Sequence, residues 1–116
     1  MKTVGIVACS NGLKPEFKNQ NEELFNYLNS IGSKVVLSRC IYEKNGVFSG
    51  TGKERASELM RMFKNPDIEE IYDISGGDLA NQILDELDYT AIMNSRAIFW
   101  GYSDLTTIIN AIYSKT

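Results

Sequence analysis

Residues 97–109 of this chain read Ala97-Ile98-Phe99-Trp100-Gly101-Tyr102-Ser103-Asp104-Leu105-Thr106-Thr107-Ile108-Ile109. The first four residues form the short apolar run of a buried strand, and the residues from Leu105 onward have the pattern of a helix. Gly101 marks the turn between the two. A strand that runs directly into a helix is the repeating unit of α/β proteins, so this stretch predicts the fold class.

The same unit recurs along the rest of the chain. The sequence predicts strands over residues 3–8, 34–38, 68–74 and 97–100, and helices over residues 16–31, 51–64, 79–87 and 105–114. Because strands and helices alternate, the strands must pair in parallel through right-handed crossovers. We therefore expect a three-layer α/β sandwich with a mostly parallel, flavodoxin-like sheet and helices on both faces.

Two of the expected helices carry clear end signals. Thr51 and Glu54 have the spacing of a capping box, and Asn65-Pro66 ends the helical pattern that follows them. Gly32 follows the first helix, where a C-terminal cap needs a left-handed residue. The sequence also predicts which side chains of these helices face the sheet: Leu24, Leu28 and Ile31 in the first, and Ala56, Leu59, Met60 and Phe63 in the second.

Composition limits the class of protein. The chain has 116 residues, 43% of them hydrophobic, which suits one globular domain. Its net charge of −3 is spread without a basic block, which argues against a nucleic-acid partner. No signal peptide or membrane-spanning run is visible, so we expect a cytoplasmic protein. Cys9 and Cys40 lack metal-ligand spacing and there is no histidine, so we expect reduced, buried thiols and neither metal nor cofactor.

Ligands of open parallel sheets gather at the carboxyl ends of the strands, where loops meet helix N-termini. Four predicted loops lie there, at residues 9–12, 39–41, 75–78 and 101–104. The last one resembles a nucleophile elbow, in which Ser103 projects its hydroxyl from a turn between strand and helix. The match is partial, because Leu105 stands where the second glycine belongs. Ser103 acting simply as a helix N-cap is the alternative.

The loop Ser75-Gly76-Gly77-Asp78 can present backbone N–H groups to a developing oxyanion or to a carboxylate. The alternative is an ordinary tight turn. Asp104 cannot complete a triad with its neighbour Ser103 without a histidine, so its backbone N–H is the more reasonable contribution. Three further carboxylates form a cluster that we interpret as a solvated face or a helix cap: Asp85, Glu86 and Asp88.

These features resemble the N-terminal domain of the LD-carboxypeptidase family of serine peptidases, which includes the microcin C immunity peptidases. The most specific part is residues 101–106, followed by Ala111-Ile112. The rest of the resemblance spans nearly the whole chain and comprises Val4-Gly5-Ile6-Val7, Ser10, Ser49-Gly50-Thr51, Lys53-Glu54-Arg55-Ala56, Leu59-Met60, Ser75-Gly76-Gly77, Leu84-Asp85, Leu87-Asp88-Tyr89 and Ile92.

The resemblance implies hydrolysis of an amide bond next to a free carboxylate in a small peptide, often between an L- and a D-amino acid of a murein peptide. Ser103 matches the nucleophile, and the backbone N–H groups of Asp104 and Gly77 match the oxyanion hole. Gly76, Asp78 and Ser10 are the candidates for contact with substrate. Asp78 departs from many relatives, which have an aromatic or small polar residue there.

The family's glutamate and histidine lie in a C-terminal domain. Residues 1–116 therefore correspond to one nucleophile-bearing domain, which we expect to be inactive alone because an unassisted serine is a weak nucleophile. The chain ends at the close of a predicted helix, which suggests a domain of a longer protein, with a natural short chain as the alternative.

Two other hypotheses come from different classes of protein. One is a non-catalytic, flavodoxin-like module whose glycine loops bind a small anion or a nucleotide, although no Walker lysine or G-x-G-x-x-G pattern is present. The other is self-association into a homodimer through the surface that the missing domain would cover. That surface would include the apolar side chains of Ile108, Ile112 and Tyr113.

Overall fold

The computed structural model contains one four-stranded parallel sheet. It describes residues 2–44, 49–75 and 79–101. The strands lie in the order β2-β1-β3-β4, with bounds Lys2–Val7 (β1), Ser33–Leu37 (β2), Ile68–Asp73 (β3) and Ile98–Trp100 (β4). All three neighbouring pairs are parallel. The predicted α/β class and each of the four predicted strands are confirmed within a residue or two.

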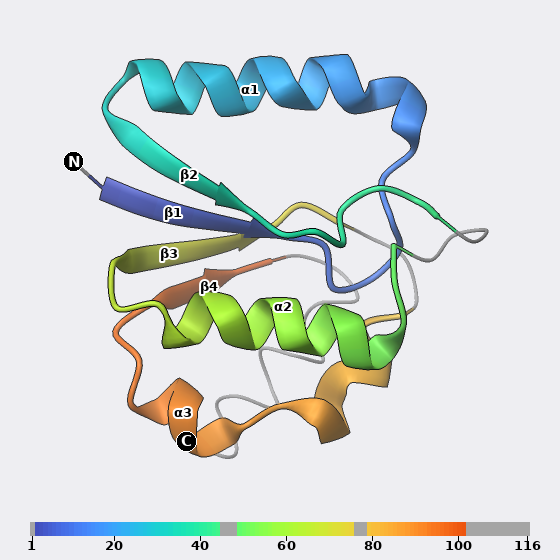
Figure 1. The fold of residues 1–116 in the computed structure, drawn as a ribbon, viewed down its shortest axis with the longest axis vertical. Helices are drawn as coiled ribbons and strands as arrows, with labels where there is room; N and C mark the ends of the chain where they lie inside the picture. The colour runs from blue at the N-terminus through green and yellow to red at the C-terminus, as the bar shows by residue number, and fades with distance from the viewer. Residues whose placement is uncertain (1, 45–48, 76–78, 102–116) are drawn as a thin grey trace.

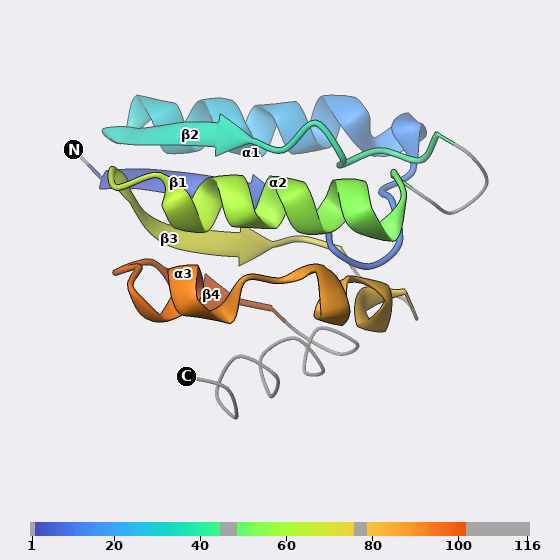
Figure 2. The same cartoon turned by 60° about the horizontal axis from the view of Figure 1, so that its bottom comes forward.

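Helices cover both faces of the sheet, as Figures 1 and 2 show. One face carries the short 3-10 turn η1 (Pro15–Phe17) and α1 (Lys18–Ser30). The other carries α2 (Gly52–Lys64), η2 (Ala80–Glu86) and α3 (Tyr89–Met93). The three layers predicted from the sequence are confirmed. None of the described helices is both long enough and apolar enough to cross a membrane.

The larger core lies between the sheet and α2. Leu59, Met62 and Ile71 have no exposed surface there, and Ile83 of η2 closes the same cluster. Gly5 of β1 permits this close packing, because a Cβ atom at that position would lie 2.8 Å from Sδ of Met62. Helix α2 therefore packs directly on β1, and this packing fixes the position of the polar residues of α2 relative to the sheet.

Both ends of α2 follow the sequence signals. The Thr51 side chain accepts a hydrogen bond from the Glu54 N–H at 3.0 Å, and the Glu54 carboxylate accepts one from the Thr51 N–H at 2.9 Å. The predicted capping box is therefore confirmed. Gly32 has a φ of +93°, which confirms the left-handed residue expected after α1.

The predicted inner face of α1 is wrong. Leu24 and Ile31 are 49% and 59% exposed, whereas Phe25 is 5% exposed and packs with Ile6 and Ile41. Leu28 is half-buried, so the inner stripe runs through Phe25 and Leu28. Leu28 has helical spacing both to Leu24 and Ile31 and to Phe25. Periodicity alone therefore does not tell which of the two sets faces the sheet.

The region between β3 and β4 differs from the prediction in two ways. Residues 79–87 form the 3-10 helix η2 in place of an α-helix, although Ile83 and Leu87 are buried and Leu84 is half-buried, as expected for inward side chains. Helix α3 was not predicted. Its N-cap is Asp88, whose side chain accepts from the Ala91 N–H at 3.1 Å, which confirms a cap among the acidic cluster. The helix predicted at residues 105–114 lies outside the described residues.

Candidate active site

The carboxyl ends of β1 and β3 lie side by side at one edge of the sheet. Val7 pairs with Asp73, so the residues that follow each strand enter the same space. The Ser10 N–H donates to the Ser75 hydroxyl oxygen at 3.1 Å across this edge. Ser10 itself has no exposed surface. The loops predicted after these two strands therefore begin side by side and are joined by a hydrogen bond.

Asp73 organises that point through its carboxylate. Oδ2 accepts from the Cys9 N–H at 2.8 Å, and Oδ1 accepts from both the N–H and the hydroxyl of Ser75, at 2.8 and 2.5 Å. The residue is 6% exposed. A buried carboxylate that receives these bonds ties the end of β1 to the first residue of the next loop.

Burial governs the acid–base properties here. It raises the pKa of the Asp73 carboxyl, and the hydrogen bonds from Ser75 and Cys9 only partly offset that effect. Burial, followed by the proximity of Asp73, raises the pKa of the Cys9 thiol well above its ordinary value. A thiol with a raised pKa is a poor nucleophile, so Cys9 is a structural residue.

Arg55 of α2 reaches the same edge from the other side. Its side chain is almost completely buried, at 1% exposed. Nη1 donates to the backbone oxygen of Cys9 at 2.6 Å and to that of Leu79 at 3.0 Å, while Nε donates to the oxygen of Gly50 at 3.1 Å. Nη2 donates to the Gln82 side chain. One guanidinium thus joins three segments of the chain, at Cys9, at Gly50 and at Leu79 with Gln82.

The structure describes some of the predicted site residues. Ser10 is at the expected edge, with its hydroxyl oxygen accepting from the Leu79 N–H at 3.2 Å. β4 pairs with β3 through Tyr72 and Trp100, so Gly101 also follows a strand at this edge. The remaining candidates, Gly76, Gly77, Asp78, Ser103 and Asp104, lie outside the described residues. Their roles stay predictions.

Arg55, Asp73 and Gln82 belong to this edge but were not predicted as site residues from the sequence. Arg55 belongs to the stretch Lys53-Glu54-Arg55-Ala56, which is part of the family resemblance. An arginine in a helix is usually exposed to solvent. Its place next to Ala56, which was predicted to face the sheet, was the one sign that it could be buried. Asp73 is the last residue of β3, which is a weak signal by itself. Contacts between distant segments give these residues their importance, and such contacts are not visible in local patterns.

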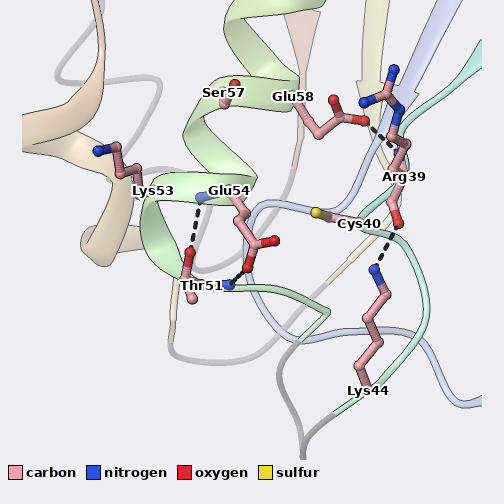
Figure 3. Close-up of a pocket in the computed structure, with 8 residues that line it drawn as sticks. All are labelled: Arg39, Cys40, Lys44, Thr51, Lys53, Glu54, Ser57 and Glu58. Carbon is pink, nitrogen blue, oxygen red and sulfur yellow. Dashed lines mark hydrogen bonds between the residues drawn. The ribbon is translucent and has the colours of Figure 1, made fainter.

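A separate pocket of about 450 Å³ opens at the end of β2, as Figure 3 shows. Glu58 lies on its wall and accepts from the Arg39 N–H at 2.5 Å, from the Ser38 hydroxyl at 3.2 Å and from Arg61. Burial raises the pKa of Glu58, but the bonds from Arg61, Arg39 and Ser38 outweigh it and lower the pKa overall. Burial raises the pKa of the Cys40 thiol on the same wall. The Glu58 carboxylate is therefore engaged in structural bonds.

Metal ligands do not gather in the part of the chain that the structure describes. Within residues 2–44, 49–75 and 79–101, no three histidine, cysteine, aspartate or glutamate side chains are close enough to share an ion. The polar groups at the β1–β3 edge are bonded to backbone groups of neighbouring segments. The described edge is therefore built to hold loops in place.

Known proteins resemble the chain over almost its full length. The family model described as the LD-carboxypeptidase N-terminal domain matches residues 4–116. The microcin C7 self-immunity protein MccF of Escherichia coli is 37% identical over 114 residues, which are 98% of this chain and 33% of MccF. A probable murein peptide carboxypeptidase of Bacillus subtilis is 30% identical over 114 residues, covering 98% of this chain and 35% of that protein.

Solved structures show the same fold. MccF in complex with aspartyl sulfamoyl adenosine superposes with a TM-score of 0.91 at 36% identity, covering 99% of this chain and 34% of that one. The chain thus spans about a third of the length of these relatives. Fold, sequence and family match agree over the whole described region. The chain belongs to the LD-carboxypeptidase family and corresponds to its N-terminal domain.

Proposed function

We propose that this chain is the nucleophile-bearing domain of a serine carboxypeptidase and that Ser103 is the nucleophile. The observation that carries the proposal is the position of β4. Because β4 lies beside β3 in parallel, Gly101 leaves the sheet next to the strand that leads through Ser75 into the paired glycines. The predicted elbow and the predicted oxyanion loop therefore start from neighbouring strand ends.

The reaction follows the usual course of acyl transfer. The Ser103 hydroxyl attacks the amide carbonyl and loses its proton to a general base, while the N–H groups of Gly77 and Asp104 donate to the oxyanion. The base returns the proton to the leaving amine, and water then hydrolyses the acyl-enzyme. This chain has no histidine, so the base must come from outside residues 1–116. The C-terminal domain implied by the family resemblance would supply it together with a glutamate.

We propose a small substrate with an amide bond next to a free carboxylate. Two relatives support this class: one is named a murein peptide carboxypeptidase, and MccF is known in complex with aspartyl sulfamoyl adenosine. The first name specifies a peptide as the substrate, and the second complex contains an aspartyl compound. Gly76, Asp78 and Ser10 are the proposed contacts to such a substrate, and the buried Ser10 would act close to the loop that it already bonds.

Several further features belong to the same proposal. We expect residues 1–116 without the remaining domain to lack peptidase activity, because losing the general base of a triad lowers turnover by about 10⁶-fold. A cytoplasmic location fits a substrate recycled inside the cell. Self-association through the surface around Ile108, Ile112 and Tyr113 would apply to the isolated domain.

The test is turnover by the full-length protein. Ser103→Ala should reduce kcat for an LD-peptide amide with a free carboxylate by about 10⁴-fold or more. Ser57→Ala is the control, because Ser57 is an exposed serine of α2. A Ser103→Ala protein that turns over as fast as the unaltered enzyme would remove Ser103 from the mechanism and reject the proposal.

A further inference from the structure

Both residues that flank the loop 76–78 are tied to other parts of the fold. Before the loop, Ser75 bonds to Asp73 and to the Ser10 N–H. After it, the Leu79 N–H donates to the Ser10 hydroxyl oxygen at 3.2 Å, and the Leu79 carbonyl accepts from Arg55 at 3.0 Å. The loop is thus held at both ends by the terminus of β1 and by α2.

Arg55 is the hub of this arrangement. It is a buried cation, and within the described residues no carboxylate lies at ion-pair distance from it. Burying an unpaired charge is unfavourable unless fixed dipoles replace its water. Here the carbonyl oxygens of Cys9, Gly50 and Leu79 replace it. The guanidinium is planar and rigid, so it also fixes where those three segments lie relative to one another.

We infer that Arg55 is a positioning residue for the proposed oxyanion hole, acting through Leu79 and through the Cys9-Ser10 segment. The inference rests on the proposed function, since it gives the Gly77 N–H a catalytic role. Ser75 and Leu79 are the described residues on either side of Gly77 in the chain, and the bonds to Ser10 and Arg55 fix the positions of both.

The competing explanation is that Arg55 only stabilises the fold. The two differ in what happens to catalysis by molecules that remain folded. A misplaced oxyanion donor weakens binding of the transition state more than binding of the substrate, so it lowers kcat and leaves KM nearly unchanged. A purely stabilising residue changes the unfolding temperature but neither kinetic constant.

The experiment compares Arg55→Lys with Arg61→Lys in the full-length protein. Arg61 also lies on α2 and also donates to a carbonyl, that of Leu37, but at the β2 end of the sheet, away from the loop. We expect Arg55→Lys to lower kcat by about 10-fold to 100-fold with KM within about twofold, because small misplacements at a catalytic centre have effects of that size. Arg61→Lys should leave both constants unchanged.

Amide hydrogen exchange supplies a readout that does not depend on turnover. Peptides spanning residues 75–79 should exchange about tenfold faster in Arg55→Lys than in the unaltered protein or in Arg61→Lys. If Arg55→Lys fails to fold, Gln82→Met removes one acceptor of the same guanidinium and should shift kcat and exchange in the same direction.

The outcomes separate the two proposals. Unchanged exchange at residues 75–79 overturns the inference whatever the enzyme does, and so does faster exchange with an unchanged kcat in an enzyme that depends on Ser103. If Arg55→Lys exchanges faster but the unaltered protein shows no turnover, the proposed function is rejected, while the contacts of Arg55 that hold Leu79 and Cys9 are supported. Faster exchange together with a lower kcat and a constant KM supports the inference.

Discussion

Two strand ends of this sheet are closed by buried carboxylates in different ways. At the end of β3, Asp73 accepts from Cys9 and Ser75 and from no other described residue, and the nearby cation Arg55 donates to backbone carbonyls. At the end of β2, Glu58 accepts from the Arg39 N–H but also pairs directly with Arg61 at 3.1 Å. The charges are therefore separated at one end and paired at the other.

The difference shows what each arrangement can do. A direct ion pair neutralises its members and, when partly exposed, fixes little else. Separated charges must each be satisfied by neutral groups, and here those are backbone N–H and C=O groups of loops. The β1–β3 edge thereby acquires a backbone framework fixed by hydrogen bonds, beside the end of β4. The β2 end has a stable corner beside an open pocket.

The largest expected effect is on stability. It tests whether Arg55, which bonds to backbone carbonyls, contributes more to the free energy of unfolding than Arg61, which pairs with Glu58. Arg55→Met should lower the free energy of unfolding by about 3 kcal/mol or more, because each buried carbonyl left without a donor costs about 1 kcal/mol or more. Arg61→Met, in which a half-exposed ion pair is lost, should cost about 1 kcal/mol or less. Urea unfolding of both variants measures the two values.

Equal losses in the two variants would contradict the comparison. They would mean that the carbonyl oxygens of Cys9, Gly50 and Leu79 find other donors when the guanidinium is removed. In that case the framework at the β1–β3 edge would not depend on Arg55. The two strand ends would then differ in the arrangement of their charged groups but not in how much those groups contribute to stability.

The sequence predicted the fold well because the relevant signals are local. Each of these signals depends on residues that are close in the sequence. They are the alternation of strands and helices, the Thr51–Glu54 capping box and the glycine at position 32, and the structure contains all of them. The errors fall where local signals are ambiguous. Leu24 and Ile31 lie at helical spacing from Leu28, as the buried Phe25 does, so spacing alone did not identify the inner stripe. Residues 79–87 are too short a run to distinguish a 3-10 helix from an α-helix.

The site was predictable only in part. Topology alone brings Ser10 and the loop after β3 to one edge, because parallel strands end together. Arg55 and Asp73 were not assigned a role, since their bonds join segments such as Cys9 and Leu79 that are far apart in the chain. A buried charge satisfied by distant backbone groups leaves no periodic pattern in a sequence.

The pH dependence of stability should have opposite signs at the two strand ends. Glu58 has a lowered pKa when folded, so its contribution is present above its unfolded pKa and is lost as the pH falls. Asp73 has a raised pKa, so its contribution is fully present below its unfolded pKa and is lost as the pH rises through the folded value. Replacing each carboxylate by its amide, in Glu58→Gln and Asp73→Asn, should therefore change the pH dependence of stability in opposite directions.

The stability advantage of the unaltered protein over Glu58→Gln should be larger at about pH 7 than at about pH 4. Its advantage over Asp73→Asn should be larger at about pH 4 than at about pH 7. Urea unfolding across this range measures both differences. The same sign for the two variants would show that the two carboxylates have similar surroundings, against the structure.

The smallest expected effect concerns the two cysteines, one at each strand end. Cys9 is 1% exposed and bonded into the framework, whereas Cys40 is 4% exposed but lines the open pocket in Figure 3. Burial raises the pKa of both thiols, so access decides which reacts first. We expect a neutral thiol reagent to label Cys40 about tenfold faster than Cys9, because Cys9 requires local opening of the β1–β3 edge.

Mass spectrometry of the labelled protein assigns the two sites, and Cys40→Ser isolates the slower one. Arg55→Met should raise the labelling rate of Cys9, because the Cys9 carbonyl then loses its donor. Arg61→Met should leave Cys9 unaffected, since its contacts lie at the β2 end. If Cys9 reacts as fast as Cys40 in the unaltered protein, the edge beside the predicted nucleophile opens readily. The rigid framework inferred from Asp73 and Arg55 would then be wrong.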